Sequence, residues 1–207
     1  MIDGDPHTLY RQALAVDKNR LESFSDGVIA IILTIMVLEL KVPQQPTLAG
    51  LGQLWPVYVA YALSFGNVFM MWLAHHEIVA SVRSVNYSML FANGALLFFM
   101  SLVPFATAFA SETHWTEAVP VALYGVVMLA ASGGFAWFRL ATGSHAQDAA
   151  VLARQGAQAL TTLGVGCAFL IGSVAAFYEP RVALFLYAAV PVMRVGYQYG
   201  FGRGGKA

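Results

Sequence analysis

Charged residues are scarce in this 207-residue chain, and neither sign is in excess: Lys and Arg number 11, Asp and Glu number 11, and together they make up 11% of the sequence. Soluble domains carry roughly a quarter charged residues, whereas 58% of this chain is hydrophobic. It lacks the polar groups to cover a globular surface, and we expect lipid to surround it. Without a basic excess the chain has no means of neutralising a run of phosphates, which excludes nucleic-acid binding.

The single cysteine, Cys167, excludes an intramolecular disulfide, a thiolate metal cluster and CxxC redox chemistry. Phosphate-binding Gly-Lys-Ser loops, GxSxG elbows and HExxH zinc motifs are absent as well. His75-His76-Glu77 comes nearest to a metal site, but three consecutive helical residues point about 100° apart and do not converge on one ion. We therefore expect neither an enzyme nor a bound metal or cofactor.

Long apolar runs are what the sequence has instead. A transmembrane helix needs about 20 mainly apolar residues, and six segments meet that requirement. They run, in chain order, from Arg20 to Leu40, Leu54 to Ala80, Tyr87 to Ala110, Trp115 to Arg139, Leu160 to Tyr178 and Val182 to Tyr199. Pro104 is expected to kink the third segment, and the prolines favour a packed bundle because freed backbone groups need partners in lipid. The predicted fold is an all-α membrane protein with six transmembrane helices.

Basic residues are distributed unevenly between the two sides of this predicted bundle. The side that holds both termini collects nine of them, and the other side only Lys41 and Arg181. By the positive-inside rule both termini are cytoplasmic. We expect a cytoplasmic segment at 1–19, a six-helix transmembrane domain at 20–199 and a cytoplasmic tail at 200–207. The longest interior loop, roughly 141–159, is too short for a domain, so the function must lie in the membrane.

Polar side chains stand at the start of the first segment, where Ser25 and Asp26 lead into an apolar run. Ionisable groups are expensive at membrane depth, so Asp26 needs a partner. One interpretation is a helix cap and anchor, with Asp26 at the positive helix end and Arg20 reaching the lipid headgroups. The other is a fixed network between helices.

The second and third segments offer partners for such a network. Trp72, His75 and Asn93 are available on them. Trp72 is three residues before His75 and four before His76, which places all three side chains near one helix face. The histidines are predicted to be structural partners; titration of one of them, as a pH sensor, is the alternative.

The apolar part of the first segment has a face of its own. On a 3.6-residue wheel Ile31, Thr34, Ile35 and Leu38 form one stripe about 100° wide, and Asp26 falls on roughly the opposite side. If Asp26 faces its own subunit, the stripe points away from that bundle. Periodicity alone leaves lipid, another subunit and a central axis as possible neighbours.

The residues that carry these features resemble a known family. Arg20-xxx-Phe24-Ser25-Asp26, leading into Gly-Val-Ile-Ala-Ile-Ile-Leu-Thr, is similar to the signature first helix of the prokaryotic homologues of transmembrane protein 175, which are potassium-permeable channels. The resemblance continues through Trp72-xx-His75-His76, Asn93 and Pro104-Phe105-x-Thr107, and covers residues 20 to 107.

The resemblance implies a homotetramer in a prokaryotic cell membrane, with a central pore lined by the first helix of each subunit and no filter loop. Potassium is the permeant ion, and membrane lipid surrounds the tetramer. Carried over from Phe24, the narrow apolar gate falls on Ile31, the layers beyond it on Ile35 and Leu38, and the selectivity threonine on Thr34. The implied structural network maps onto Arg20, Ser25, Asp26, Trp72 and His75, with His76 and Asn93.

A neck of four isoleucines can lose its water, and it then conducts only when it widens. Four threonine hydroxyls replace only part of the hydration shell of potassium, so modest selectivity is expected. The main alternative is a proton-coupled secondary transporter that uses Asp26 and His75.

Overall fold

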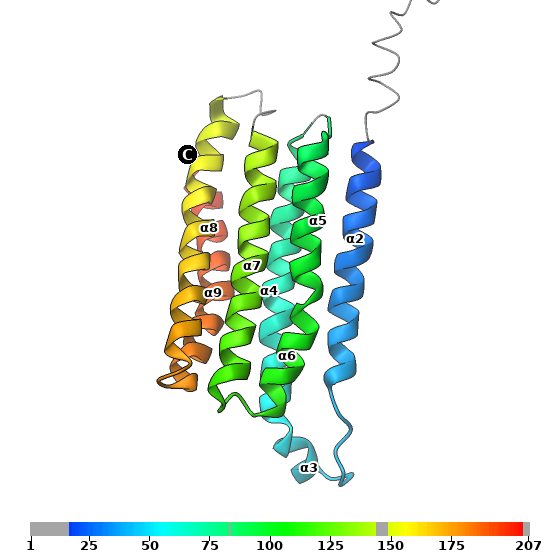
Figure 1. Cartoon of the computed structure of the whole chain (residues 1–207), viewed down its shortest axis with the longest axis vertical. Helices are drawn as coiled ribbons and strands as arrows, with labels where there is room; N and C mark the ends of the chain where they lie inside the picture. Colours follow the sequence, from blue (N-terminus) through cyan, green and yellow to red (C-terminus); the bar gives the residue numbers. More distant parts are fainter. Residues whose placement is uncertain (1–16, 83, 144–148, 205–207) are drawn as a thin grey trace, which may run out of the picture.

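The computed structural model describes residues 17–82, 84–143 and 149–204, which form an elongated bundle of helices (Figure 1). Long helices run along the bundle, and the short helix α3 lies at one end. The elements are α2 (Lys18–Ile35), the 3-10 helix η1 (Met36–Glu39), α3 (Leu48–Gln53), α4 (Trp55–Ala80), α5 (Tyr87–Ser101), α6 (Val103–Glu112), α7 (Ala118–Gly143), α8 (Ala149–Ala175) and α9 (Pro180–Gly204).

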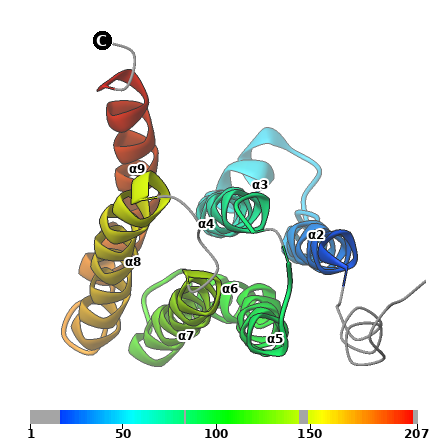
Figure 2. The ribbon, with the colours of Figure 1, turned by 90° about the horizontal axis from the view of Figure 1, so that it is seen from above.

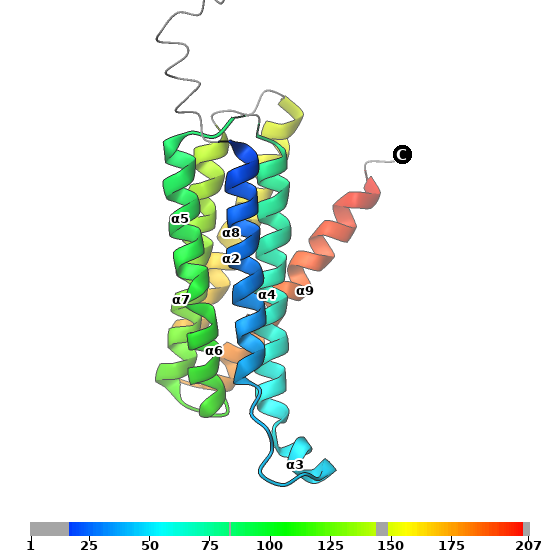
Figure 3. The same ribbon diagram turned by 90° about the vertical axis from the view of Figure 1, so that its right-hand side faces the viewer.

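The helices are arranged so that α2 occupies one edge of the bundle (Figure 2). It packs against α4 and α5, while α7 lies between α5 and α8. At the opposite side α9 packs on α8 and then leaves the bundle at an angle (Figure 3). One flank of α2 therefore has no neighbour within the subunit.

Four helical segments of the described residues are long and apolar enough to cross a membrane: Lys18–Glu39, Trp55–Ala80, Tyr87–Glu112 and Ala118–Thr142. They coincide with the first four predicted segments, and the prediction of an all-helical membrane protein is confirmed. The apolar part of α8, Thr161–Ala175, is shorter. The count of six crossings and the side on which the termini lie stay predictions.

The third crossing is broken into α5 and α6 at Leu102, two residues before Pro104. Proline has no backbone N–H and its ring displaces the carbonyl four residues earlier, so an unbroken helix is disfavoured there. The Leu102 N–H turns to the carbonyls of Phe99 and Met100 instead.

The predicted interior loop at 141–159 is wrong over most of its length. Helix α7 continues to Gly143 and α8 already begins at Ala149. Residues 149–159 include five Ala and two Gln, which favour helix without being apolar enough to mark a span. Helix α9 likewise runs to Gly204, five residues beyond the predicted last segment and into the predicted tail.

Local sequence signals set where two of the crossings begin. The Asp17 carboxylate accepts a hydrogen bond from the Asn19 N–H at the start of α2, and Asn86 accepts one from the Met89 N–H at the start of α5. Such side-chain caps satisfy backbone donors that the first helical turn leaves unpaired.

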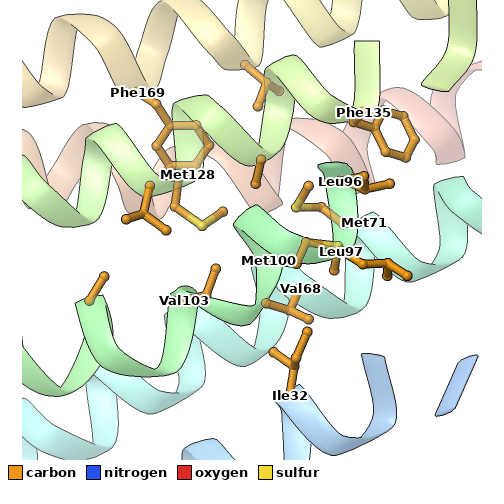
Figure 4. Close-up of a cluster of buried hydrophobic side chains, with 14 of the residues drawn as sticks. Ile32, Val68, Met71, Leu96, Leu97, Met100, Val103, Met128, Phe135 and Phe169 are labelled. Carbon is orange, nitrogen blue, oxygen red and sulfur yellow. The ribbon is translucent and has the colours of Figure 1, made fainter. Parts of the chain in front are cut away.

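The centre of the bundle is filled by apolar side chains from several helices (Figure 4). Met71 of α4, Met100 of α5 and Met128 of α7 are almost fully buried there, and flexible methionines fit irregular gaps. Ile32 reaches this cluster from α2. The buried side of α2 is thereby fixed against the rest of the subunit.

Tyr187 of α9 fits between two glycines on neighbouring helices. A β-carbon added at Gly125 of α7 or at Gly172 of α8 would overlap the Tyr187 side chain. The Tyr187 hydroxyl donates to the Val121 carbonyl over 3.2 Å. Small residues thus let α9 approach closely, which is how helices commonly pack in lipid.

Candidate functional site

Helix α2 has a covered face and an uncovered face. The covered face buries Leu21, Ser25, Ile29 and Ile32. On the other face the exposed fractions are 58% for Ile31, 43% for Ile35 and 76% for Leu38, and Thr34 is exposed too. The predicted stripe, on α2 and at Leu38 of η1, is therefore left open by its own subunit.

The Thr34 hydroxyl lies on this uncovered face and bonds within its own helix. Its Oγ1 is 3.0 Å from the carbonyl oxygen of Ala30 and 3.0 Å from that of Ile31, to either of which it donates. This arrangement is common for threonine in helices. Because the proton is engaged by the helix, the lone pairs of Oγ1 are available to a cation or a water molecule in front of the stripe.

Asp26 lies on the side of α2 that faces α4. Its Oδ1 accepts a hydrogen bond of 2.8 Å from the indole N–H of Trp72. Trp72 has one donor and no acceptor, so this contact satisfies it completely. The structure thus joins two of the predicted network residues across a helix interface.

A second, fully buried contact joins three helices through Asn93 of α5. The Asn93 side-chain amide donates to Ser25 Oγ over 2.9 Å, and Asn93 Oδ1 lies 2.9 Å from His75 Nε2. Since that oxygen only accepts, the geometry assigns the imidazole proton to Nε2. Ser25 in turn donates to the Leu21 carbonyl over 2.8 Å. Every link in this chain has a matched donor and acceptor.

The ring of His75 is held from the other side by Phe138 of α7, with ring centroids 5.1 Å apart and planes within 9°. Its Nδ1 is buried and has no hydrogen-bond partner in the described part of the chain. A proton on Nδ1 would be unpaired, so the site favours the neutral imidazole. This geometry agrees with a structural role for His75.

His76 and Arg20 lie outside the buried cluster. The His76 ring is exposed, packs on Trp72 at a centroid distance of 6.1 Å and places Nδ1 3.3 Å from Glu22 Oε1. Arg20 is exposed on the first turn of α2, and no side-chain contact of it with the cluster is found among the described residues. The network role of Arg20 stays a prediction.

Sequence reasoning missed Glu22 as a partner of α4. Glu22 and Asp26 are four residues apart on α2, and Trp72 and His76 are four apart on α4. Because the two helices are antiparallel, Glu22 lies opposite His76 and Asp26 lies opposite Trp72, and the two contacts are one helical turn apart. Equal spacing on both helices is the signal that identifies the Glu22–His76 contact.

A polar cluster in the other half of the bundle was missed as well. Thr107 of α6 donates to Ser64 of α4 over 2.8 Å, and Ser64 lies 3.3 Å from the hydroxyl of Tyr124 on α7. All three are buried. Hydrogen bonds of this kind link helices where lipid offers no alternative partner.

The C-terminal end of α2 continues into η1, and the segment that follows is tied to α6 by an exposed ion pair. Lys41 Nζ lies 2.8 Å from Glu112 Oε1, and this carboxylate raises the pKa of Lys41.

Nearby, a groove of about 460 Å³ separates α2 from α6 and is bordered by Ile31, Ile35 and Glu39. Among the described residues no group of His, Cys, Asp and Glu is arranged to hold a metal ion.

Comparison with known proteins places these features in a family. The chain matches the family described as endosomal/lysosomal potassium channel TMEM175 over residues 20–104. It is 35% identical over 141 residues to the potassium channel B446_29190 of Streptomyces collinus, covering 64% of this chain and 68% of that protein. The chain belongs to the TMEM175 family. Because this is a family of ion channels, the prediction that the chain is not an enzyme is confirmed.

Two further similar proteins support membership of the TMEM175 family. The potassium channel HX13_20290 of a Chryseobacterium species is 48% identical over 112 residues, which are 54% of this chain and 58% of that protein. The match thus spans less than two thirds of that relative. The crystal structure of a lysosomal potassium-selective channel TMEM175 homolog from Chamaesiphon minutus is 26% identical, with a TM-score of 0.76 over 86% of this chain and 96% of that chain.

Proposed function

We propose that the chain is one subunit of a potassium-permeable cation channel, in which four copies surround a pore lined by α2. The observation that carries this proposal is the division of α2 into two faces. Its polar groups Ser25 and Asp26 are bonded inside the subunit, while an apolar stripe that includes Ile31 has no cover. The bacterial relatives are named potassium channels, and on that basis we propose potassium as the permeant ion.

Ile31 is the proposed gate. Four isoleucine side chains that meet at an axis form a neck that water leaves readily, and a hydrated ion passes only when the neck widens. Ile35 and Leu38 form further apolar layers toward the outside. Leu38 belongs to η1 rather than α2, and the tighter winding of a 3-10 helix changes its direction relative to Ile31.

Thr34 is the proposed selectivity layer. Its hydroxyl proton is engaged by α2 carbonyls, so four oxygen atoms with free lone pairs would face the axis. Oxygen ligands replace part of the hydration shell, and potassium gives up its shell at lower cost than sodium. Four hydroxyls are fewer ligands than the carbonyl cage of a filter loop, so the preference for potassium is modest.

In this proposal the buried network fixes the position of α2 against α4 and α5. Asp26 and Ser25 fix two successive positions of α2 to α4 and α5, and His75 and Asn93 complete the buried part. We assign His76 and Arg20 to the exposed margin of the same network.

Helix lengths and charge support the membrane arrangement that we propose. Helices α8 and α9 contain 27 and 25 residues, more than the ~20 that cross a bilayer. We propose six crossings with both termini in the cytoplasm, in a prokaryotic plasma membrane.

Ion flux through purified protein tests this function. Protein in liposomes should carry potassium down its gradient when the proton gradient is zero, and sodium more slowly. A proton-coupled transporter would stall under these conditions because no protons can flow in exchange. Flux that appears only with a pH difference would reject the channel, and protein-free liposomes give the background.

A further inference from the structure

A carboxylate stands beside the groove that separates α2 from α6. Glu39 is the last residue of η1 and is partly buried. It lines the groove together with Ile31 and Ile35. Among the described residues that line this groove, Glu39 is the one with a charge, and the others are apolar except Ser101. Glu39 is thus held at the border of the face of α2 that its own subunit leaves uncovered.

Glu39 lies beyond the apolar stripe, at the C-terminal end of the first crossing. It follows Ile35 by four residues, a rise of about 6–8 Å along the helix axis. The negative end of the α2 dipole lies at the same end of the bundle (Figure 1). Because this end of a helix favours cations, a carboxylate here needs a positive charge in front of it.

The basic side chain nearest to Glu39 in the sequence is already engaged. Lys41 lies two residues further on, and its Nζ is 2.8 Å from Glu112 Oε1 on α6. Two carboxylates therefore share one ammonium group, and each subunit keeps one negative charge in excess in this segment. All three side chains lie at the end of the bundle to which α2 and α6 run.

We propose that Glu39 sets the cation concentration at the pore mouth at this end of α2. The inference rests on the proposed function, since four copies of α2 around one axis place four Glu39 carboxylates at one level. A ring of negative charge at a narrow entrance raises the local concentration of potassium and repels anions. Glu39 thereby controls how many cations reach the pore, while Ile31 and Thr34 act on the ions that enter it.

Single-channel conductance tests this role with purified full-length protein in bilayers of phosphatidylcholine, which has no net charge. Glu39→Gln should lower the potassium conductance about threefold in about 0.01 M KCl, where the Debye length is ~30 Å. In about 1 M KCl, where it is ~3 Å, the loss should nearly vanish. Glu39→Asp should keep most of the conductance. Glu179→Gln is the matched control, because Glu179 is an exposed carboxylate at the same end of the bundle, between α8 and α9.

Restoring a charge on one variant separates the effect of charge from that of side-chain shape. Cys167 is exposed, so Cys167→Ser removes its thiol, and Glu39→Cys then supplies one thiol at the mouth. A methanethiosulfonate reagent that carries a sulfonate should raise the low-salt conductance of this variant, because a negative charge returns. The corresponding trimethylammonium reagent should lower it, and Cys167→Ser alone should respond to neither.

Three results would overturn the proposal: equal low-salt conductance in wild type and Glu39→Gln, the same loss at low and high salt, or an equal loss in Glu179→Gln. The same response to both reagents would show that Glu39 acts through its volume, and would also overturn it. Failure of the channel is distinguishable from these results. Wild-type protein without potassium current at any salt concentration would reject the proposed function itself, whereas a conducting protein that is insensitive to the charge at Glu39 would reject only this inference.

Discussion

The indole N–H of Trp72 donates a 2.8 Å hydrogen bond to Asp26, and this contact joins α4 to the helix whose other face is uncovered. It lies one helical turn from the Glu22–His76 pair. The two contacts fix α2 on the side opposite Ile31. The interactions that position α2 and the side chains proposed to line the pore are thus on different faces of one helix.

Replacement of Asp26 tests the positioning role. Asp26→Ala leaves the Trp72 N–H without a partner, which costs on the order of 1–3 kcal/mol, and we expect less assembled protein. Asp26→Asn keeps the accepting oxygen and should assemble nearly as well. Size-exclusion chromatography with mass determination measures the assembled fraction. A fully assembled Asp26→Ala channel with altered ion selectivity would contradict the assignment.

Asn93 is the shared partner of Ser25 and His75, so Asn93→Leu should destabilise the subunit more than loss of a single bond. We expect a loss of about 1–3 kcal/mol, measured as a lower thermal unfolding midpoint in detergent. Ser101→Ala is the matched control on α5, because Ser101 is exposed and bonds only to the Phe98 carbonyl among the described contacts. Equal midpoints for both variants would show that the buried network contributes little.

Ile31→Asn should raise the resting potassium conductance without loss of assembly. A polar side chain keeps the neck wet and removes the barrier to hydrated ions. Leu163→Asn, at an exposed position of α8, is the control and should leave the conductance unchanged. Single-channel recording in lipid bilayers makes the comparison, and unchanged current in Ile31→Asn would remove Ile31 from the gate.

Thr34→Ala should lower the ratio of potassium to sodium permeability, because the oxygen layer in front of α2 is lost. Thr34→Ser keeps the hydroxyl and should preserve most of the ratio. Reversal potentials under biionic conditions report it directly. If alanine and serine give the same ratio as threonine, selectivity arises elsewhere.

Two glycines of α8 give a matched test of helix packing. Gly172→Ala places a methyl group against the Tyr187 ring and should lower the unfolding midpoint, whereas Gly164 faces open space within the subunit. Alanine improves helix propensity by about 1 kcal/mol at either site, so Gly164→Ala should be neutral or stabilising. Equal effects at both positions would show that α9 does not depend on this close approach.

Much of the fold follows from the sequence because hydropathy and helix length act locally. The first four crossings are predictable within a few residues, and the opposite placement of Asp26 and Ile31 follows from 3.6-residue periodicity alone. The start of α8 could not be found in this way, because residues 149–159 form helix without being continuously apolar.

The candidate site was predictable only where one helix carries the signal. Asn93 could be named as a partner, but its simultaneous bonds to Ser25 and His75 depend on the packing of three helices. The same holds for Thr107 and Ser64, which are separated by a long stretch of chain. The stripe on α2 has no neighbour in its own chain, so helix periodicity, which acts within one chain, does not predict what covers it.

The central claim is that α2 lines the pore. An electron cryomicroscopy structure of the lipid-embedded assembly, determined in potassium-containing buffer, tests it most directly. We predict four subunits around one axis, with Ile31, Thr34, Ile35 and Leu38 of every copy facing it. An assembly in which these side chains contact lipid acyl chains, and another helix surrounds the ion pathway, would contradict the account.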